Sequence, residues 1–203
     1  MSDKEVFRSF IAVDIPSGVQ KALGQVETEL KERLPQTPVR WVDPEKIHLT
    51  LKFLGDVSRE NLEMVKKILV SEVTKRQTME IGIGGMGAFP KIRHPRVIWV
   101  GVEAPEELRA LRRGIEDGVA RLGYEYDKYD FTPHLTLGRV SRKASSREVR
   151  KVGKVLHDFK VGFIGVTRVE NVHIYRSDLQ PEGAVYTRLY TVSLAEDEGQ
   201  VVV

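Results

Sequence analysis

The sequence predicts an α+β fold of two pseudo-symmetric lobes, built mostly from antiparallel sheet with flanking helices around a central cleft. The tetrapeptide His-Leu-Thr-Leu occurs at His48–Leu51 and again at His134–Leu137, 86 residues apart in a chain of 203. Each copy lies in an alternating segment typical of a strand, and segments with helical spacing flank it. Short loops between other predicted strands favour antiparallel pairing.

The repeat also predicts how the domain is organised. We expect a single domain over residues 1–203 that contains an internal duplication, with motif strands over residues 46–54 and 132–140. No low-complexity linker divides the chain. Each lobe should therefore contribute one His-x-Thr strand to the cleft.

The elements before the first motif follow from local signals. Residues 7–15 read as a strand that ends at Pro16. Ser17 is the predicted N-cap of a helix that reaches residue 34, because apolar residues recur there at helical spacing. A short strand over residues 39–42 precedes the turn signal Asp43-Pro44.

The first motif strand is predicted to end at Gly55-Asp56, and Ser58 should cap a second helix. Pro105 suits the first position of a third helix that reaches residue 122, and Ser145 or Ser146 should cap a fourth that reaches residue 159. The remaining alternating segments predict strands over residues 79–89, 96–102, 163–175 and 185–194.

The two motif strands separate polar from apolar side chains. Side chains alternate between the faces of a strand, so Lys46, His48, Thr50 and Lys52 share one face, and Phe53 falls on the apolar face. In the second motif His134, Thr136 and Gly138 share a face. Arg139 lies on the leucine side by strict alternation and needs a bulge near Gly138 to reach the same cleft. These faces predict a polar cleft that accepts anions.

Composition excludes several classes of protein. Hydrophobic residues make up 41% and charged residues 30% of the chain, as in an ordinary globular protein. The absence of cysteine excludes disulfides, iron–sulfur clusters and thiol nucleophiles. The chain begins without an apolar signal region and holds no stretch of about 18 apolar residues. We therefore expect a monomeric cytoplasmic protein without a membrane partner.

Metal and cofactor sites are not expected. Catalytic zinc takes about three protein ligands, and neither motif offers an acidic residue or a second histidine at ligand spacing. The glycines of residues 82–87 match a dinucleotide pattern, but Phe89-Pro90 follows where that pattern needs a helix.

Basic residues are concentrated directly after the second motif, between Arg139 and Lys154, where Glu148 is the one acidic residue. Such a cluster is either a solvated helix face or a surface that binds a polyanion. The candidate RNA contacts are Lys52, Arg142, Lys143 and Tyr129. The aromatic rings of Tyr126 and Tyr129 could stack on a base, whereas Phe53 is expected in the core.

The runs Trp41–Asp56 and Phe131–Arg139 resemble the two signature motifs of the 2H phosphoesterases, and within them the RNA 2′,3′-cyclic phosphodiesterases, also called 2′-5′ RNA ligases. Further segments of the chain share the resemblance: Phe10–Pro16, Phe89-Pro90, Val97–Gly101 and Gly183–Thr187. It implies the bilobal α+β fold with a central cleft.

The resemblance also implies a chemistry. His134 would act as the general base that activates water, and His48 as the general acid that protonates the departing 3′ oxygen, which leaves a 2′-phosphate. Thr50 and Thr136 would bind the phosphate oxygens and Arg139 would add positive charge. The pseudo-symmetry leaves the two histidine roles exchangeable on the sequence alone.

The expected partner is RNA with a 2′,3′-cyclic phosphate end, such as a tRNA fragment, and the reverse reaction would form a 2′-5′ linkage without ATP. Two alternatives stay open. One is a 2H phosphoesterase that acts on small cyclic nucleotides, and the other is an RNA- or nucleotide-binding module without catalysis.

Overall fold

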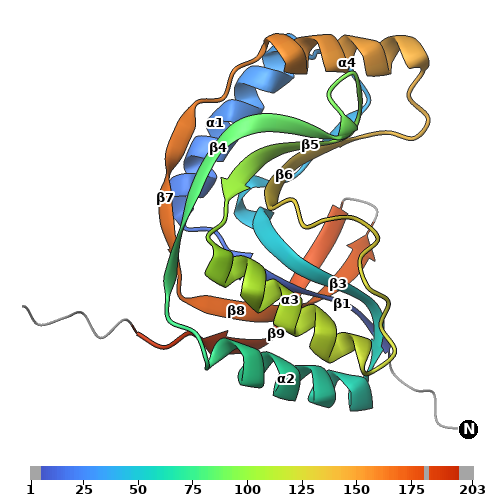
Figure 1. Ribbon diagram of the computed structural model, residues 1–203. Coiled ribbons are helices and arrows are strands. Elements are labelled where there is room, and N and C mark those ends of the chain that lie inside the picture. The colour runs from blue at the N-terminus through green and yellow to red at the C-terminus, as the bar shows by residue number, and fades with distance from the viewer. Residues whose placement is uncertain (1–5, 181–182, 197–203) are drawn as a thin grey trace, which may run out of the picture.

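The computed structural model describes residues 6–180 and 183–196. The described residues form nine strands and four α-helices (Figure 1). The helices are α1 (Ser17–Arg33), α2 (Arg59–Val73), α3 (Glu106–Ala120) and α4 (Ser146–Asp158), with a short 3-10 helix, η1, at Pro44–Lys46. The strands are β1 (Val6–Asp14), β2 (Val39–Trp41), β3 (His48–Ser58), β4 (Met79–Lys91), β5 (His94–Glu103), β6 (His134–Val140), β7 (Phe163–Val169), β8 (Asn171–Gln180) and β9 (Gly183–Ser193).

All nine strands join one antiparallel sheet, in the order β7-β4-β5-β6-β3-β1-β8-β9, with β2 paired to β6. The motif strands β3 and β6 are neighbours at its centre and pair at Leu49 and Leu135. Figure 1 shows the sheet curving into a C shape that opens to the right. The predicted α+β class and the bilobal arrangement are confirmed.

Each lobe is assembled from both halves of the sequence. The first lobe contains β3, β1, β8 and β9, and α2 and α3 pack on it; the second contains β6, β5, β4, β7 and β2, with α1 and α4. Helix α1 precedes the first motif strand in the chain yet packs against β7 of the second lobe. Neither half of the sequence therefore forms a lobe by itself.

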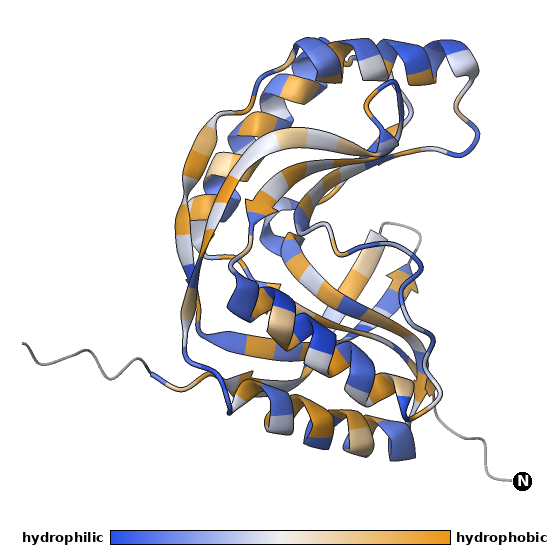
Figure 2. Ribbon diagram, in the orientation of Figure 1, coloured by the Kyte–Doolittle hydropathy of each residue, from blue (hydrophilic) through white to orange (hydrophobic). Residues whose placement is uncertain are grey.

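The helices bury one apolar face each against the sheet, and Figure 2 shows the alternating hydrophobic and hydrophilic bands along them. Ser58 caps α2 by accepting from the Asn61 backbone, as predicted. Ser145 and Glu148 form a capping box at α4. Pro16 and Pro105, however, are themselves the N-cap residues of α1 and α3, so the helices begin one residue after each proline.

Three predicted boundaries are wrong. Strand β3 runs past Gly55-Asp56 to Ser58, because Gly55 adopts a positive φ of 69° beside a register shift in its pairing with β1. Strands β4 and β5 pair as the antiparallel hairpin that the short loop predicted, but their pairing continues to Lys91 and His94, beyond the predicted ends at residues 89 and 96. The segment 163–175 contains two strands, since the chain turns at Glu170 between β7 and β8.

Candidate active site

A pocket of about 620 Å³ lies where the two lobes meet. Both motif strands line it, together with β1, β2 and the β8–β9 hairpin. Its wall includes Arg8, Phe10, Arg40, Trp41, Lys46, His48, Thr50, Phe53, His134, Thr136, Arg139, Ser177, Leu179 and Tyr186. The four His-x-Thr residues, which are distant in the sequence, thus share one cavity.

Strand alternation brings the four polar side chains to the pocket. Leu49 and Leu135 are fully buried on the helix-covered side of the sheet, so their neighbours His48, Thr50, His134 and Thr136 face the cleft. The antiparallel pairing of Leu49 with Leu135 places each histidine on the side of the other motif's threonine. A phosphate between the strands would therefore meet one imidazole and one hydroxyl from each lobe.

A backbone carbonyl fixes the tautomer of each histidine. His48 Nδ1 lies 2.9 Å from the Lys46 carbonyl oxygen, and His134 Nδ1 lies 2.8 Å from that of Thr132. A carbonyl oxygen only accepts, so Nδ1 carries a proton and donates in both rings. Nε2 is then the nitrogen that takes up or gives a proton in the cleft.

Burial sets the protonation equilibria of both rings. Burial lowers the pKa of His48 below the ordinary value, and the nearby positive charge of Arg139 lowers it further. Burial and Arg139 lower the pKa of His134 in the same way. Asp14 opposes these effects at His48 by raising its pKa.

The two motif strands carry the same bulge at the same place. Leu51 has no partner between the pairs Lys52–Ile11 and Thr50–Ala12, and Leu137 has none between Gly138–Ile98 and Thr136–Trp99. A bulge reverses the alternation of the residues that follow it. The residue five positions after each histidine therefore returns to the cleft face.

That shared position holds Phe53 in the first lobe and Arg139 in the second. Arg139 lines the pocket, and the bulge that brings it there lies at Leu137, next to the predicted Gly138. The core assignment of Phe53 is wrong: its side chain is 61% exposed and lines the same pocket. The prediction assumed strict alternation along β3 and so assigned Phe53 to the wrong face.

The same bulge turns Lys52 away from the cleft, so its assignment as an RNA contact is wrong. Lys52 is 1% exposed, and its Nζ donates to Glu116 Oε1, Asp127 Oδ1 and the Glu125 carbonyl, each at 2.8 Å. A buried ammonium is tolerated only when such partners replace its hydration. Lys52 is a structural residue of the first lobe.

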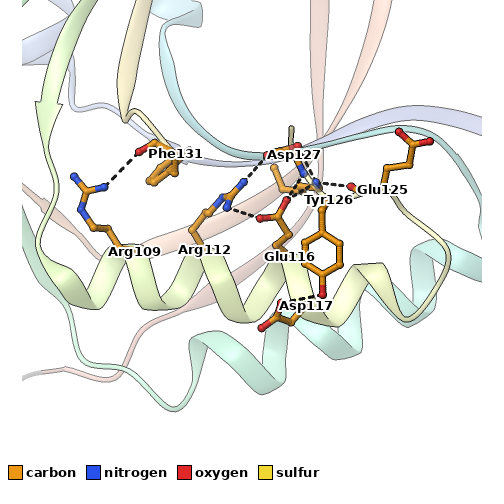
Figure 3. Close-up of polar contacts among 9 residues, drawn as sticks. Arg109, Arg112, Glu116, Asp117, Glu125, Tyr126, Asp127 and Phe131 are labelled. Atoms are coloured by element: carbon orange, nitrogen blue, oxygen red, sulfur yellow. Dashed lines mark hydrogen bonds and ion pairs between the residues drawn. The ribbon is translucent and has the colours of Figure 1, made fainter. Parts of the chain in front are cut away.

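Arg112 extends this buried ion network. It bonds Asp127 Oδ2 at 2.6 Å and pairs with Glu116, and Figure 3 shows these side chains converging above α3. Asp127 lies in the segment between α3 and β6, the segment that also carries the Thr132 carbonyl. The network therefore anchors the chain that leads into His134.

The other candidate RNA contacts lie outside the pocket. Tyr129 is 87% exposed on the segment before β6, and Tyr126 is exposed with its hydroxyl bonded to Asp117. Arg142 and Lys143 are exposed on the turn that follows β6. These two cations lie at the rim of the second lobe rather than beside the histidines.

Alternation did not predict the aromatic wall behind His48. The Phe10 ring stacks on the His48 ring at 4.7 Å, and the Tyr186 ring meets it edge-on at 5.3 Å. On the other side the Phe89 ring lies edge-on to His134 at 4.9 Å. Phe10 and Tyr186 stand in the segments that resemble the family, which is the one signal that could have found them.

The described residues bring together no cluster of three or more groups suited to hold a metal ion. The glycine pattern of residues 82–87 lies within strand β4, and no helix follows it there. None of the helices in residues 6–180 and 183–196 is long and apolar enough to cross a membrane.

The sequence is similar to proteins of known families along almost all its length. A model of the LigT-like phosphoesterases matches residues 13–99 and again residues 100–186. An RNA 2′,3′-cyclic phosphodiesterase of Archaeoglobus fulgidus is 36% identical over 182 residues, which is 90% of this chain and 97% of the relative. One of Methanothermobacter thermautotrophicus is 34% identical over 180 residues, 89% of this chain and 95% of the relative.

Solved structures share the fold. The crystal structure of TT0787 of Thermus thermophilus has a TM-score of 0.75 at 29% identity and covers 92% of this chain and 97% of its own. Escherichia coli LigT, crystallised with 3′-AMP, has a TM-score of 0.71 at 24% identity over 94% of this chain and 99% of its own, which shows similarity of fold.

Proposed function

The chain belongs to the LigT-like phosphoesterase family, and we propose that it is an RNA 2′,3′-cyclic phosphodiesterase that leaves a 2′-phosphate. The observation that carries the proposal is the pair of histidines in one cleft, each with Nδ1 held by a carbonyl and Nε2 free for proton transfer. Its curated relatives of 34–36% identity have this activity by name. Opening a cyclic phosphate requires one proton acceptor and one proton donor, which this pair supplies.

In the proposed mechanism His134 is the base and His48 the acid. Nε2 of His134 takes a proton from water as the water oxygen forms a bond to phosphorus. The bond between phosphorus and the 3′ oxygen breaks, and protonated Nε2 of His48 gives its proton to that oxygen. The 2′ oxygen keeps the phosphate, and proton exchange with solvent restores both imidazoles.

The remaining pocket residues would stabilise the phosphate. The hydroxyls of Thr50 and Thr136 would donate to its non-bridging oxygens, and Arg139 would offset the charge that gathers on them in the transition state. Because the leaving 3′ oxygen is next to His48, the ribose lies on the first lobe in this mechanism. Its base would then meet the exposed ring of Phe53 beside Phe10.

We further propose that the RNA beyond the last nucleotide contacts the basic rim of the second lobe, including Arg142 and Lys143. The substrates would be RNA ends such as tRNA fragments, and the enzyme would act as a cytoplasmic monomer without a metal or a cofactor. The cluster of basic residues between Arg139 and Lys154 supports RNA as the partner. The reverse reaction, in which a 5′ hydroxyl replaces water, would give a 2′-5′ linkage without ATP.

The test is hydrolysis of an oligonucleotide ending in a 2′,3′-cyclic phosphate, in EDTA, followed by identification of the phosphate position. We expect a 2′-phosphate at an unchanged rate, since every proposed step uses side chains of the protein. A 3′-phosphate, or loss of activity in EDTA that added metal restores, would contradict the mechanism. Faster turnover of a cyclic mononucleotide would favour small cyclic nucleotides as substrates, and binding without hydrolysis would favour a binding module.

A further inference from the structure

The strands that flank the two motif strands differ at one position. Asp14 of β1 pairs directly with His48 of β3, whereas Gly101 of β5 pairs directly with His134 of β6. Side chains of residues directly opposite each other in an antiparallel pair share a face, with their Cβ atoms about 5 Å apart. At this cross-strand position, a carboxylate therefore stands beside His48, whereas the position beside His134 has no side chain.

Asp14 is held in place by three groups that the proposed mechanism does not use. Its Oδ1 accepts from the Tyr175 hydroxyl at 2.7 Å, and its Oδ2 accepts from Arg188 at 2.5 Å. His173 Nε2 lies 3.5 Å from the same Oδ2. Tyr175 in turn stacks on Phe10, which stacks on His48. The carboxylate thus has a defined position in the layer of side chains that supports His48.

We propose that Asp14 is a positioning residue that favours the imidazolium form of His48 and so makes this histidine, rather than His134, the proton donor of the pair. The proposal rests on the proposed function. The charge of Asp14 makes the surroundings of the two histidines unequal, although their motifs are identical.

The other charged and titratable groups around His48 do not favour its protonated form over that of His134. Arg139 and His134 face it from β6, and both lower its pKa. Lys46 precedes it and Tyr186 faces it from β9. Among the described residues, Asp14 is the charged group that raises the pKa of His48, and none of the carboxylates in residues 6–180 and 183–196 does so at His134.

Packing explains why the second lobe has no equivalent carboxylate. A Cβ atom at Gly101 would lie 2.9 Å from the Gly84 carbonyl oxygen of the neighbouring strand β4, closer than such atoms approach. Any side chain there would push β4 and β5 apart. The asymmetry between the two histidines therefore follows from the close approach of β4 to β5 at Gly84 and Gly101.

The test is an NMR titration of the histidine ring protons in three proteins: wild type, Asp14→Asn and Arg188→Gln. Asp14→Asn removes the negative charge and should lower the pKa of His48, leaving that of His134 unchanged. Arg188→Gln removes the cation that neutralises Asp14 and should raise the pKa of His48. Two changes with opposite signs separate a charge effect from simple damage to the fold, and neither measurement depends on turnover.

Kinetics should follow the titration. At pH 8, where the acid must retain its proton, kcat/KM of Asp14→Asn on a cyclic-phosphate substrate should fall about three- to tenfold, and Arg188→Gln should not share this loss. Equal shifts at both histidines, or no shift at His48, would overturn the proposal. If the titrations behave as expected but the wild type hydrolyses no cyclic phosphate, the proposed function is wrong and the electrostatic asymmetry stands.

Discussion

At the scale of single residues, the site depends on two imidazoles whose orientation is set by the backbone two positions before each ring. The Lys46 and Thr132 carbonyls accept from Nδ1, so the reactive Nε2 atoms face the cleft without help from a carboxylate on Nδ1. The hydrophobic surroundings that hold the rings also lower the pKa of both. A backbone carbonyl therefore sets the orientation of each ring, and burial sets the direction in which its pKa moves.

Replacing either histidine with alanine should lower kcat about 10²- to 10⁴-fold on a cyclic-phosphate substrate, because each variant loses one proton transfer. The matched control is His94→Ala at the exposed start of β5, which should keep wild-type activity. Full activity in His48→Ala would contradict the acid–base mechanism.

The pH dependence has a definite sign. In the proposed mechanism the rate should fall at low pH, as the base His134 becomes protonated, and at high pH, as the acid His48 loses its proton. Both pKa values lie below the ordinary 6.5, so the maximum of kcat/KM against pH should lie on the acid side of that value. A maximum well above pH 7 would contradict the effect assigned to burial.

At the scale of elements, the paired bulges at Leu51 and Leu137 decide what reaches the cleft. They place the side chains of Phe53 and Arg139 on the cleft face and that of Lys52 on the opposite face, where it binds Glu116 and Asp127. A bulge depends on the pairing of two strands and leaves no mark in one strand's alternation. The glycine after Leu137 hinted at the second bulge, whereas Leu51 and Lys52 gave no sign of the first.

Lys52→Ala should lower the free energy of unfolding by about 2–4 kcal/mol, because it leaves the buried carboxylate of Glu116 without one of its partners. Denaturant titration measures this, with Lys67→Ala on the exposed face of α2 as the control, which should change stability by less than about 0.5 kcal/mol. Unchanged stability together with weaker binding of RNA would restore Lys52 as an RNA contact.

At the scale of the whole molecule, three separate elements bring positive charge to one rim of the second lobe. Arg96 on β5 donates to the Ser141 carbonyl at 2.8 Å, which joins the β4–β5 hairpin to the turn that carries Arg142 and Lys143. Helix α4 packs against the tip of this hairpin, near the carbonyl oxygens of residues 92 and 93, where Gly153 leaves room. The exposed cations of α4 are Arg147, Arg150, Lys151 and Lys154.

Substituting Arg142 and Lys143 together with alanine should raise KM for an oligonucleotide several-fold and leave a cyclic mononucleotide unaffected. The slope of log(kcat/KM) against log[salt] should also become shallower, by about 0.7 for each phosphate that the variant no longer binds. A double substitution of Arg59 and Lys67 on α2, in the first lobe, is the control. An equal fall in kcat/KM for the oligonucleotide and the cyclic mononucleotide would show that the rim acts through the catalytic site instead.

Most of the element order and the four His-x-Thr residues of the cleft could be predicted from the sequence because both follow local rules. Alternation placed His48 and His134 on polar faces, and the repeat predicted two lobes that each present one motif strand. The assembly of the lobes could not be predicted in this way. Helix α1 crosses to the second lobe, because the sheet order, and not the sequence order, decides which apolar face it covers.

The sequence by itself determined the residues that the proposed chemistry uses: two His-x-Thr strands and an arginine that needed a bulge to reach them, in a family whose fold provides the cleft. Only the tertiary structure decided what makes the two halves unequal. Phe53 and Arg139 hold equivalent positions in the two motif strands, and Asp14 and Gly101 are the strand partners of the two histidines. That each pair faces the cleft side of the sheet becomes clear once the register is known. The physical reason is that alternation depends on one strand, whereas a bulge or an opposing charge depends on two.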